Sequence, residues 1–348
     1  MIIPKFVYKG SEQSPFLAPR GIFVHQNIMA VCDTAQNRVY IWTSLPKTEF
    51  QEPDIILGTQ KDVVSASTFY YPSGLWFDGK KLIVADAWNH RVLIWNTFPT
   101  HSFTPADVVL GQADFIQNKP NVDGVNSPAS SQKLHWCYGV FSNGKSLWIA
   151  DTGNRRVLYF EFIPVENFTK ADAVIGQTNF ETKDYVSEFP TWPYSVKISE
   201  KGEMLISDTQ CFRVHYWKKW EEAIHQKADF LIGQQDFVKN GQNQFSLKPK
   251  AQTLSWCYDA IFDNVENTIY VADTGNSRIL KYNETPKQNN IFADEIYGQR
   301  GFEEVGDNIE SVMGHDDFMY WPFSITTNSD YLIVCETGNN RIFFYEKQ

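Results

Sequence analysis

One ten-residue pattern recurs six times along the 348-residue chain. It consists of an acidic residue, a short loop rich in Gly and Asn, an arginine and an alternating apolar segment. The copies begin at Asp33, Asp86, Asp151, Asp208, Asp273 and Glu336. In repeat proteins with a period of this order, each copy is one supersecondary unit that buries its apolar faces against its neighbours. The pattern therefore predicts six similar units instead of one layered core.

Each repeat can be divided into four strands. The first begins at a position that we call the landmark, occupied by Pro19, Pro72, Cys137, Pro193, Cys257 and Pro322. The second strand ends at the acidic residue, and the third opens with the arginine. The fourth ends at a glycine that lies 25 positions after the acidic residue in the first five copies. Alternating apolar runs joined by Gly- and Asn-rich turns predict four-stranded antiparallel sheets and an all-β fold.

The sixth repeat is too short to supply its own fourth strand, because only three residues follow Tyr345. The apolar segment Ile2–Lys9 precedes the first landmark and has the pattern of a strand. We predict that it provides the outer strand of the last sheet, which removes an open edge. On this interpretation residues 1–348 form a single domain.

The acidic residue and the arginine are five positions apart in all six copies, as in Asp33 and Arg38. A carboxylate at the end of one strand would face a guanidinium at the start of the next, within reach of a charge-assisted hydrogen bond. A catalytic role would require six equivalent sites. We therefore interpret the pair as a structural clasp on each hairpin.

Charge and composition restrict the classes of partner that this protein is expected to bind. The net charge is −10, so a nucleic-acid partner is not expected, since phosphate binding needs a basic face. The chain has no apolar run long enough to span a bilayer, and it begins without a signal-peptide pattern. Its five cysteines are an odd number and do not indicate a secreted disulfide framework. The expectation is a cytoplasmic protein with no membrane partner and an oligomeric state left open.

These residues resemble the NHL repeat, whose members are six-bladed β-propellers. The segments Val84–Val92 and Val271–Ile279 are close matches to this repeat. Leu110–Gln112 resembles a short motif found in a bacterial subset of NHL repeats. The resemblance implies a propeller whose loops open around a central channel. NHL proteins include protein- and RNA-binding modules, and related propellers include lyases and hydrolases with a metal ion in the channel. The resemblance therefore allows a metal ion in the channel. The seven histidines do not recur at one repeat position, so we assign no metal ligands from the resemblance.

Aromatic residues flank the landmark in most repeats. A tryptophan precedes it in four copies, and an aromatic ring follows it in the same four. These rings and Tyr71 are the predicted ligand-binding residues: Tyr71, Trp136, Tyr138, Trp192, Tyr194, Trp256, Tyr258, Trp321 and Phe323. Alternate positions on a strand face the same side, so they would line an aromatic cup at the channel. Packing between blades is the competing interpretation. The long links Ile116–Lys133, Val238–Thr253 and Glu303–Asp317 could cover the cup.

Two repeats break their own pattern at the landmark. Cys137 and Cys257 replace proline, and Asp259 replaces a Gly or Ser found at that position elsewhere. The two cysteines and His135 are candidate metal ligands or, together with Asp259, candidate catalytic groups. Cysteine acting as a small apolar residue is the alternative. Cys211 lies in a hairpin loop, where we expect an exposed thiol.

The leading hypothesis is a binding protein that holds a small-molecule, carbohydrate-like or peptide ligand in the aromatic cup. The first alternative is an enzyme of lyase or hydrolase type, with or without a bound metal ion. The binding hypothesis is preferred to it. A protein–protein interaction scaffold is the second. No other cofactor is indicated.

Overall fold

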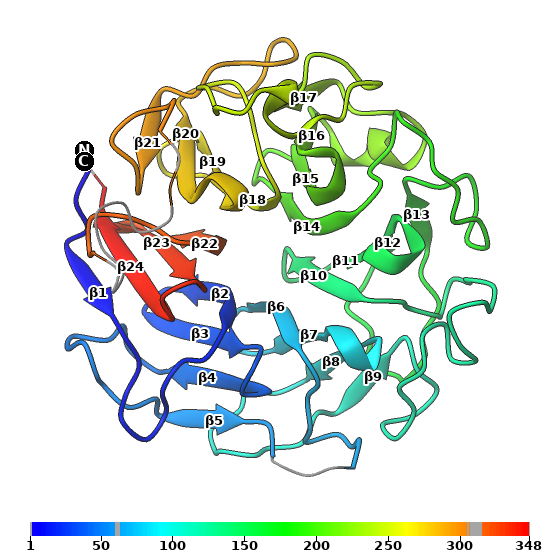
Figure 1. Ribbon diagram of the computed structural model, residues 1–348. Coiled ribbons are helices and arrows are strands. Elements are labelled where there is room, and N and C mark those ends of the chain that lie inside the picture. Colours follow the sequence, from blue (N-terminus) through cyan, green and yellow to red (C-terminus); the bar gives the residue numbers. More distant parts are fainter. Residues whose placement is uncertain (1, 60–62, 305, 307–314, 348) are drawn as a thin grey trace. The chain divides into compact units, whose positions relative to one another are not determined.

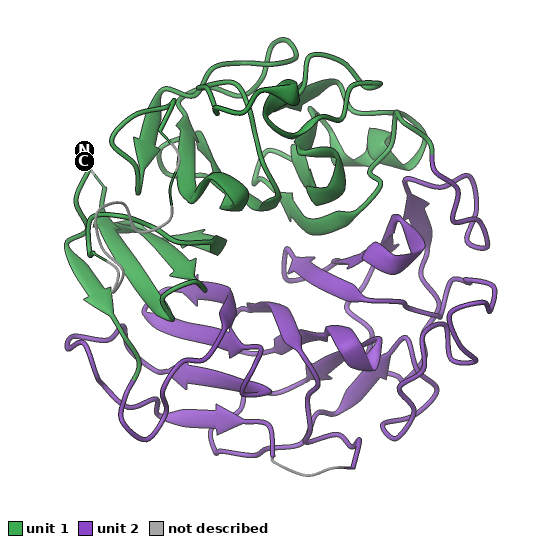
Figure 2. Cartoon of the chain, in the orientation of Figure 1, with its two compact units in different colours: residues 1–10, 186–348 green, residues 11–185 purple. Residues whose placement is uncertain are grey.

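The computed structural model describes residues 2–59, 63–304, 306 and 315–347. The chain divides into two compact units, one formed by residues 1–10 and 186–348 and the other by residues 11–185 (Figure 2). Each sheet lies within one unit. The units are therefore described separately below.

The fold is all-β and is a six-bladed β-propeller, as predicted. Its six blades are four-stranded antiparallel sheets, which we number in chain order (Figure 1). In blades 1 to 5 the strands pair in the order in which they occur along the chain, so each of these blades is a simple meander.

The unit of residues 11–185 contains blades 1 to 3. Blade 1 consists of β2 (Pro19–His25), β3 (Ile28–Asp33), β4 (Arg38–Trp42) and β5 (Ile55–Leu57). Blade 2 consists of β6 (Pro72–Phe77), β7 (Leu82–Asp86), β8 (Arg91–Trp95) and β9 (Val108–Leu110). Blade 3 consists of β10 (Cys137–Ser142), β11 (Leu147–Asp151), β12 (Arg156–Phe160) and β13 (Ala173–Ile175).

The other unit contains blades 4 to 6. Blade 4 consists of β14 (Pro193–Ile198), β15 (Met204–Asp208), β16 (Arg213–Trp217) and β17 (Phe230–Ile232). Blade 5 consists of β18 (Cys257–Asp263), β19 (Thr268–Asp273), β20 (Arg278–Tyr282) and β21 (Glu295–Tyr297). Blade 6 consists of β22 (Pro322–Thr327), β23 (Tyr331–Glu336), β24 (Arg341–Glu346) and β1 (Phe6–Tyr8).

The N-terminal strand completes blade 6. Phe6 pairs with Phe344 and Tyr8 with Ile342, antiparallel to β24 (Figure 1). Val7 and Tyr8 are buried in this position. The prediction that the segment around 2–9 supplies the missing outer strand is confirmed, although the strand itself covers only three residues.

The strand boundaries follow the repeated residues. Every innermost strand begins at its landmark, every second strand ends at the acidic residue, and every third strand begins at the arginine. Short 3-10 turns fill four of the hairpins between the second and third strands: η1 (Ala87–Asn89), η2 (Thr152–Asn154), η3 (Thr209–Cys211) and η6 (Thr274–Asn276). In each, the residue that enters the third strand has a left-handed backbone, for example His90 at φ 52°.

Apolar side chains from adjacent blades form the cores. In the unit of residues 11–185, one cluster joins blades 1 and 2 and another joins blades 2 and 3. In the other unit, one cluster joins blades 4 and 5 and another joins blades 5 and 6. Of two further 3-10 segments, η4 (Trp220–Ile224) lies between β16 and β17 of blade 4, and η5 (Gln242–Phe245) lies in the link before blade 5. No helix among the described residues is long and apolar enough to cross a membrane.

Candidate functional site

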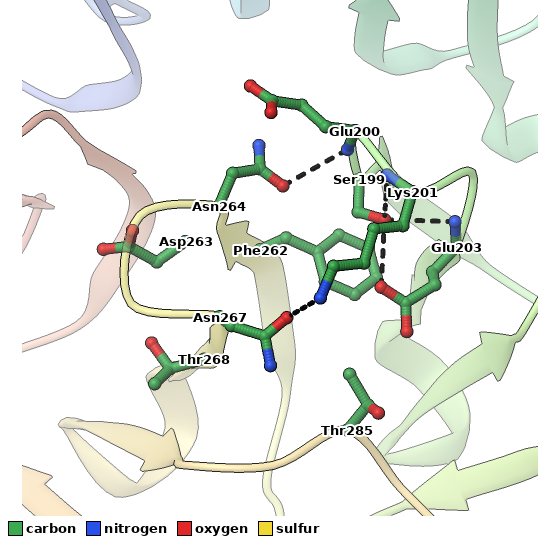
Figure 3. Close-up of a pocket in the computed structure, with 10 residues that line it drawn as sticks. All are labelled: Ser199, Glu200, Lys201, Glu203, Phe262, Asp263, Asn264, Asn267, Thr268 and Thr285. Carbon is green, nitrogen blue, oxygen red and sulfur yellow. Dashed lines mark hydrogen bonds between the residues drawn. The ribbon is translucent and has the colours of Figure 1, made fainter.

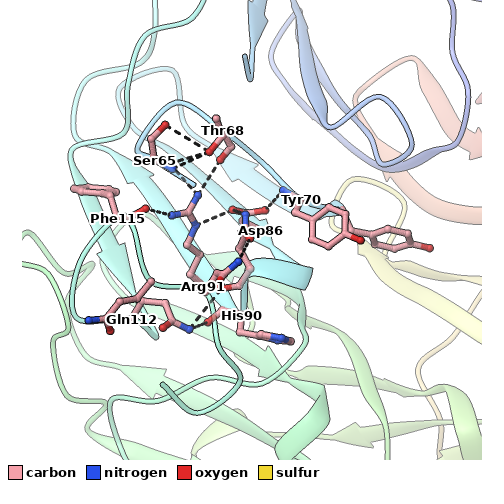
Figure 4. A network of polar contacts seen from close by, with 12 residues as sticks. Ser65, Thr68, Tyr70, Asp86, His90, Arg91, Gln112 and Phe115 are labelled. Atoms are coloured by element: carbon pink, nitrogen blue, oxygen red, sulfur yellow. Dashed lines mark hydrogen bonds and ion pairs between the residues drawn. The ribbon is translucent and has the colours of Figure 1, made fainter. Parts of the chain in front are cut away.

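The acidic residue and arginine form a buried clasp in five of the six blades. In blade 2, Arg91 Nε donates to Asp86 Oδ2 at 2.7 Å, and both side chains are fully buried (Figure 4). The same ion pair joins Asp151 to Arg156, Asp208 to Arg213, Asp273 to Arg278 and Glu336 to Arg341. The structural interpretation of the pair is confirmed in these blades.

The clasp also fixes the link that leads into each blade. Arg91 donates to the carbonyl oxygens of Ser65, Thr68 and Phe115, at 2.6 to 2.9 Å (Figure 4). Asp86 accepts the backbone N–H of Tyr70 at 2.7 Å. The Arg91 guanidinium thus makes four hydrogen bonds, one to Asp86 and three to the adjoining links. That arrangement compensates for the cost of burying two charges, and it leaves neither group available to a ligand.

Blade 1 departs from this pattern, and the expectation of six clasps is wrong there. Among the described contacts, Arg38 makes no ion pair with Asp33. It donates instead to the Gly58 carbonyl and lies 5.6 Å from the ring centroid of Phe103. Asp33 is satisfied by the backbone N–H groups of Leu17 and Ala18, at 2.8 and 3.1 Å. The carboxylate therefore keeps its role in holding the link without the arginine.

The residues before the landmark have an uncommon backbone. Tyr71, Trp136, Trp256 and Trp321 all lie in the left-handed region, with φ between 49° and 60°. A bulky side chain rarely adopts this conformation, and such strain persists only where the surroundings determine it. For Tyr71 the determinant is a hydrogen bond from its N–H to Asn37 Oδ1, at 2.8 Å in the hairpin of the preceding blade. The Trp136 N–H makes the equivalent bond to His90 Nδ1, at 3.0 Å.

This conformation leaves two tryptophans partly exposed in the unit of residues 186–348. Trp256 and Trp321 are each 44 % exposed. Trp256 packs edge-on against Phe212, the left-handed residue of the blade 4 hairpin, with ring centroids 5.2 Å apart. Trp192, at the corresponding position of blade 4, instead donates its N–H to Asp208 at 2.8 Å. Adjacent blades 5 and 6 thus each present one accessible indole.

The rings after the landmark pack against one another. Tyr194 meets Tyr258 edge-on at 4.6 Å, and Tyr258 meets Phe323 at 4.3 Å. A β-bulge at this position of every innermost strand interrupts the alternation that would point these rings the same way as the preceding tryptophans. Tyr194 and Phe323 are buried. These three rings therefore form a layer between blades, which is the packing contact that the sequence left as an alternative.

A second aromatic series lies in the unit of residues 11–185. The Arg20 guanidinium lies 4.9 Å from the Tyr71 ring, which stacks on Trp88 at 4.7 Å. Trp88 Nε1 in turn donates to the Tyr138 hydroxyl at 3.3 Å. Trp88 is 39 % exposed and was not among the predicted site residues. It occupies a hairpin position that holds Gly in three other repeats, and that replacement was the available signal.

His90 and His135 form a neutral pair beside Trp136. Their ring centroids are 5.3 Å apart, and His135 lies 4.6 Å from Trp136. Burial, and then the neighbouring His135, lowers the pKa of His90 to about 3. Burial also lowers the pKa of His135, while Asp151 opposes the shift. Because His90 Nδ1 accepts the Trp136 N–H, its remaining proton is on Nε2.

Asp259 bridges three blades. It accepts hydrogen bonds from the Ser324 hydroxyl at 3.0 Å and the Ile325 N–H at 3.1 Å, both in blade 6. Lys197 Nζ of blade 4 lies 3.6 Å from its other oxygen. The Asp259 carboxylate is almost completely buried. This geometry favours a role in fixing blades 4, 5 and 6 over proton transfer to a ligand.

The landmark cysteines are buried and hydrogen-bonded. The Cys137 thiol donates to the Arg91 carbonyl at 3.2 Å, and the Cys257 thiol donates to the Arg213 carbonyl at 3.3 Å. Burial raises the pKa of both thiols well above the ordinary value. Neutral buried thiols are poor nucleophiles and poor metal ligands. The cysteine at this position thus joins one blade to the preceding one.

Cys211 is buried, so the expectation of an exposed thiol is wrong. It is 2 % exposed, and its sulfur donates to the Thr191 hydroxyl at 3.3 Å. Burial raises its pKa to about 11. The short η3 turn directs this side chain inward, as it does the Asn that occupies the same position in other repeats. Among the described residues, no group of three His, Cys, Asp or Glu side chains could hold a metal ion.

Two of the long links are anchored by matching amide pairs. Asn121 exchanges two hydrogen bonds with Asn154 in the blade 3 hairpin, at 3.1 and 2.9 Å. Asn243 does the same with Asn276 in blade 5, at 3.0 and 2.9 Å. The links Ile116–Lys133 and Val238–Thr253 are therefore structured segments. Most of the third, Glu303–Asp317, lies outside the described residues.

A hollow of about 260 Å³ lies between the turns that join the first two strands of blades 4 and 5 (Figure 3). The Phe262 ring lies among polar side chains, including Asn264 and Asn267. Lys201 donates to Asn267, which closes the hollow on one side. None of its lining residues was predicted, because no repeat position marks them.

Comparison with known proteins adds no identification: no protein-family model matches the chain, and no curated protein matches it.

Proposed function

We propose that this protein is a binding protein of the NHL-repeat type, and that its ligand stacks on the exposed indoles of Trp256 and Trp321. The observation that carries the proposal is that these two side chains occupy equivalent positions in adjacent blades and are each 44 % exposed on a left-handed backbone. A packing residue would gain more from burial than from this strained, half-exposed position.

The contacts of Asp259 favour a neutral ligand. Asp259 is the acidic residue nearest to Trp256 along the sequence, but its carboxylate already contacts Lys197, Ser324 and Ile325. It therefore offers no free charge to a cation. Indole faces bind sugar rings through apolar C–H surfaces, and a neutral carbohydrate-like ligand fits this chemistry best.

Titration calorimetry with a panel of neutral oligosaccharides tests the proposal. We expect binding by the wild-type protein and a loss of at least about tenfold in affinity in Trp256→Ala and in Trp321→Ala, since each removes a stacking face worth over 1 kcal/mol. Trp88→Ala is the matched control, because Trp88 is a comparably exposed indole on the other unit. Binding that is absent throughout, or equal in all variants, would contradict the proposal.

The enzyme alternative has its own observable. If Cys137 or Cys257 held a catalytic metal, the purified protein would contain a stoichiometric metal ion, and Cys→Ser substitution would remove it. The hydrogen bonds of both thiols to backbone carbonyls favour the binding proposal instead. Elemental analysis of the wild-type and Cys257→Ser proteins distinguishes the two.

A further inference from the structure

The link before blade 5 presents apolar side chains to solvent. Val238, Phe245 and Leu247 are 74 %, 78 % and 99 % exposed. Residues 238–250 also include three lysines and no acidic residue, in a chain whose net charge is −10. Exposed apolar side chains grouped in this way mark an interaction surface. We call Phe245 and Leu247 the apolar tip.

The tip is held rigidly. Asn243, Gln244 and Phe245 are three consecutive left-handed residues, with φ of 48°, 56° and 65°. The Gln244 amide donates to the carbonyls of Gly233 and Gln252, at 3.2 and 3.3 Å. Together with the Asn243–Asn276 pair, these bonds determine a conformation that the backbone would not adopt alone. A fixed apolar tip loses little entropy on binding.

A hollow of about 600 Å³ lies beside the tip. Phe292, which is 65 % exposed, and Phe302 contribute its apolar surface, and Glu303 and Glu304 contribute carboxylates. Gln252 lines the hollow and accepts the hydrogen bond from Gln244. Lys250, three residues after Leu247, also lines the hollow, so the tip and the hollow adjoin each other.

The two parts of this surface differ in charge, although Lys250 of the tip segment also lines the hollow. The tip is apolar and is followed directly by Lys248, whereas the hollow is lined by two phenylalanines and two glutamates. Phe245 and Leu247 are not among the residues that line the hollow of their own chain. A surface that carries both a protrusion and its complement is suited to two-fold symmetric contact.

We propose that a second copy of this chain docks here, with the tip of each copy inserted into the hollow of the other. In this dimer Phe245 and Leu247 contact the partner subunit's Phe292 and Phe302, and Lys248 faces the partner subunit's Glu304. A lipid surface would use the tip but not the hollow.

Sedimentation equilibrium of the full chain over a range of concentrations tests the proposal. We expect a concentration-dependent dimer, and a dissociation constant at least about 30-fold higher in Phe245→Ser/Leu247→Ser, as for central interface residues. The matched control is Ile116→Ser/Val125→Ser in the link before blade 3, where the two side chains are 71 % and 56 % exposed. A wild-type monomer at all concentrations, or equal effects in the two double variants, would overturn the proposal.

A charge reversal tests the geometry. Lys248→Glu should weaken the dimer about fivefold, and adding Glu304→Lys should restore it, since the pair would be re-formed with opposite signs. No recovery would contradict the placement of the tip in the hollow. Wild-type protein that stays monomeric but co-sediments with phosphatidylcholine–phosphatidylserine vesicles would assign the tip to lipid and overturn the dimer.

Discussion

Blade 5 carries two features that recur along the chain, and they differ in almost every physical property. Asp273 and Arg278 are completely buried, and Arg278 makes hydrogen bonds to the carbonyls of Lys250, Thr253 and Phe302 as well as to Asp273. Trp256 is nearly half exposed and touches one neighbouring ring. Both recur across blades, so repetition alone does not separate residues that build the fold from residues available to a ligand. Burial and hydrogen bonding do.

The largest expected effect on stability comes from removing the arginine of a buried clasp. Arg278→Ala should lower the free energy of unfolding by about 3 to 5 kcal/mol, because it leaves the Asp273 carboxylate buried without its partner. Arg38→Ala should cost only about 1 kcal/mol, because Asp33 does not depend on Arg38. Denaturant unfolding measures both. Equal losses would show that the ion pair itself contributes little.

A smaller effect concerns the histidine that holds Trp136. His90 has a pKa of about 3 in the folded protein and an ordinary value of 6.5 when unfolded. The unfolded chain therefore binds more protons between these values, and stability falls as the pH falls below 6.5. His90→Asn keeps an acceptor for the Trp136 N–H, as Asn37 does for Tyr71, but it does not titrate.

The His90→Asn protein should thus lose stability with falling pH less steeply, by up to about 1.4 kcal/mol per pH unit. Unfolding curves between pH 6.5 and 4 provide the measurement. An unchanged slope would mean that His90 titrates normally in the folded protein.

The sequence predicted the fold nearly completely, because each repeated residue marks a strand boundary. Pro72, Asp86 and Arg91 begin or end a strand where expected, and β1 completes blade 6. Only the ion pair of blade 1 was mispredicted, because Asp33 accepts the N–H groups of Leu17 and Ala18 and Arg38 turns to the Gly58 carbonyl. A spacing of five residues does not encode that geometry.

The candidate site was less predictable. The aromatic positions could be listed, but the β-bulge and the left-handed residue before it separate Trp256 from Tyr258, and neither has a sequence signal. The amide pair of Asn243 with Asn276 depends on the path of a long link. The apolar tip lies in a link whose length and sequence differ between repeats, so comparison among the six copies could not assign it a role.

The free energy of unfolding of Trp256→Ala tests most directly whether this indole is available to a ligand. The loss of one edge-on ring contact should cost about 1 kcal/mol, well below the loss expected for Arg278→Ala in the same blade. That result would show that the fold depends on Arg278 much more than on Trp256. A loss as large as that of Arg278→Ala would make Trp256 a packing residue and would contradict the account.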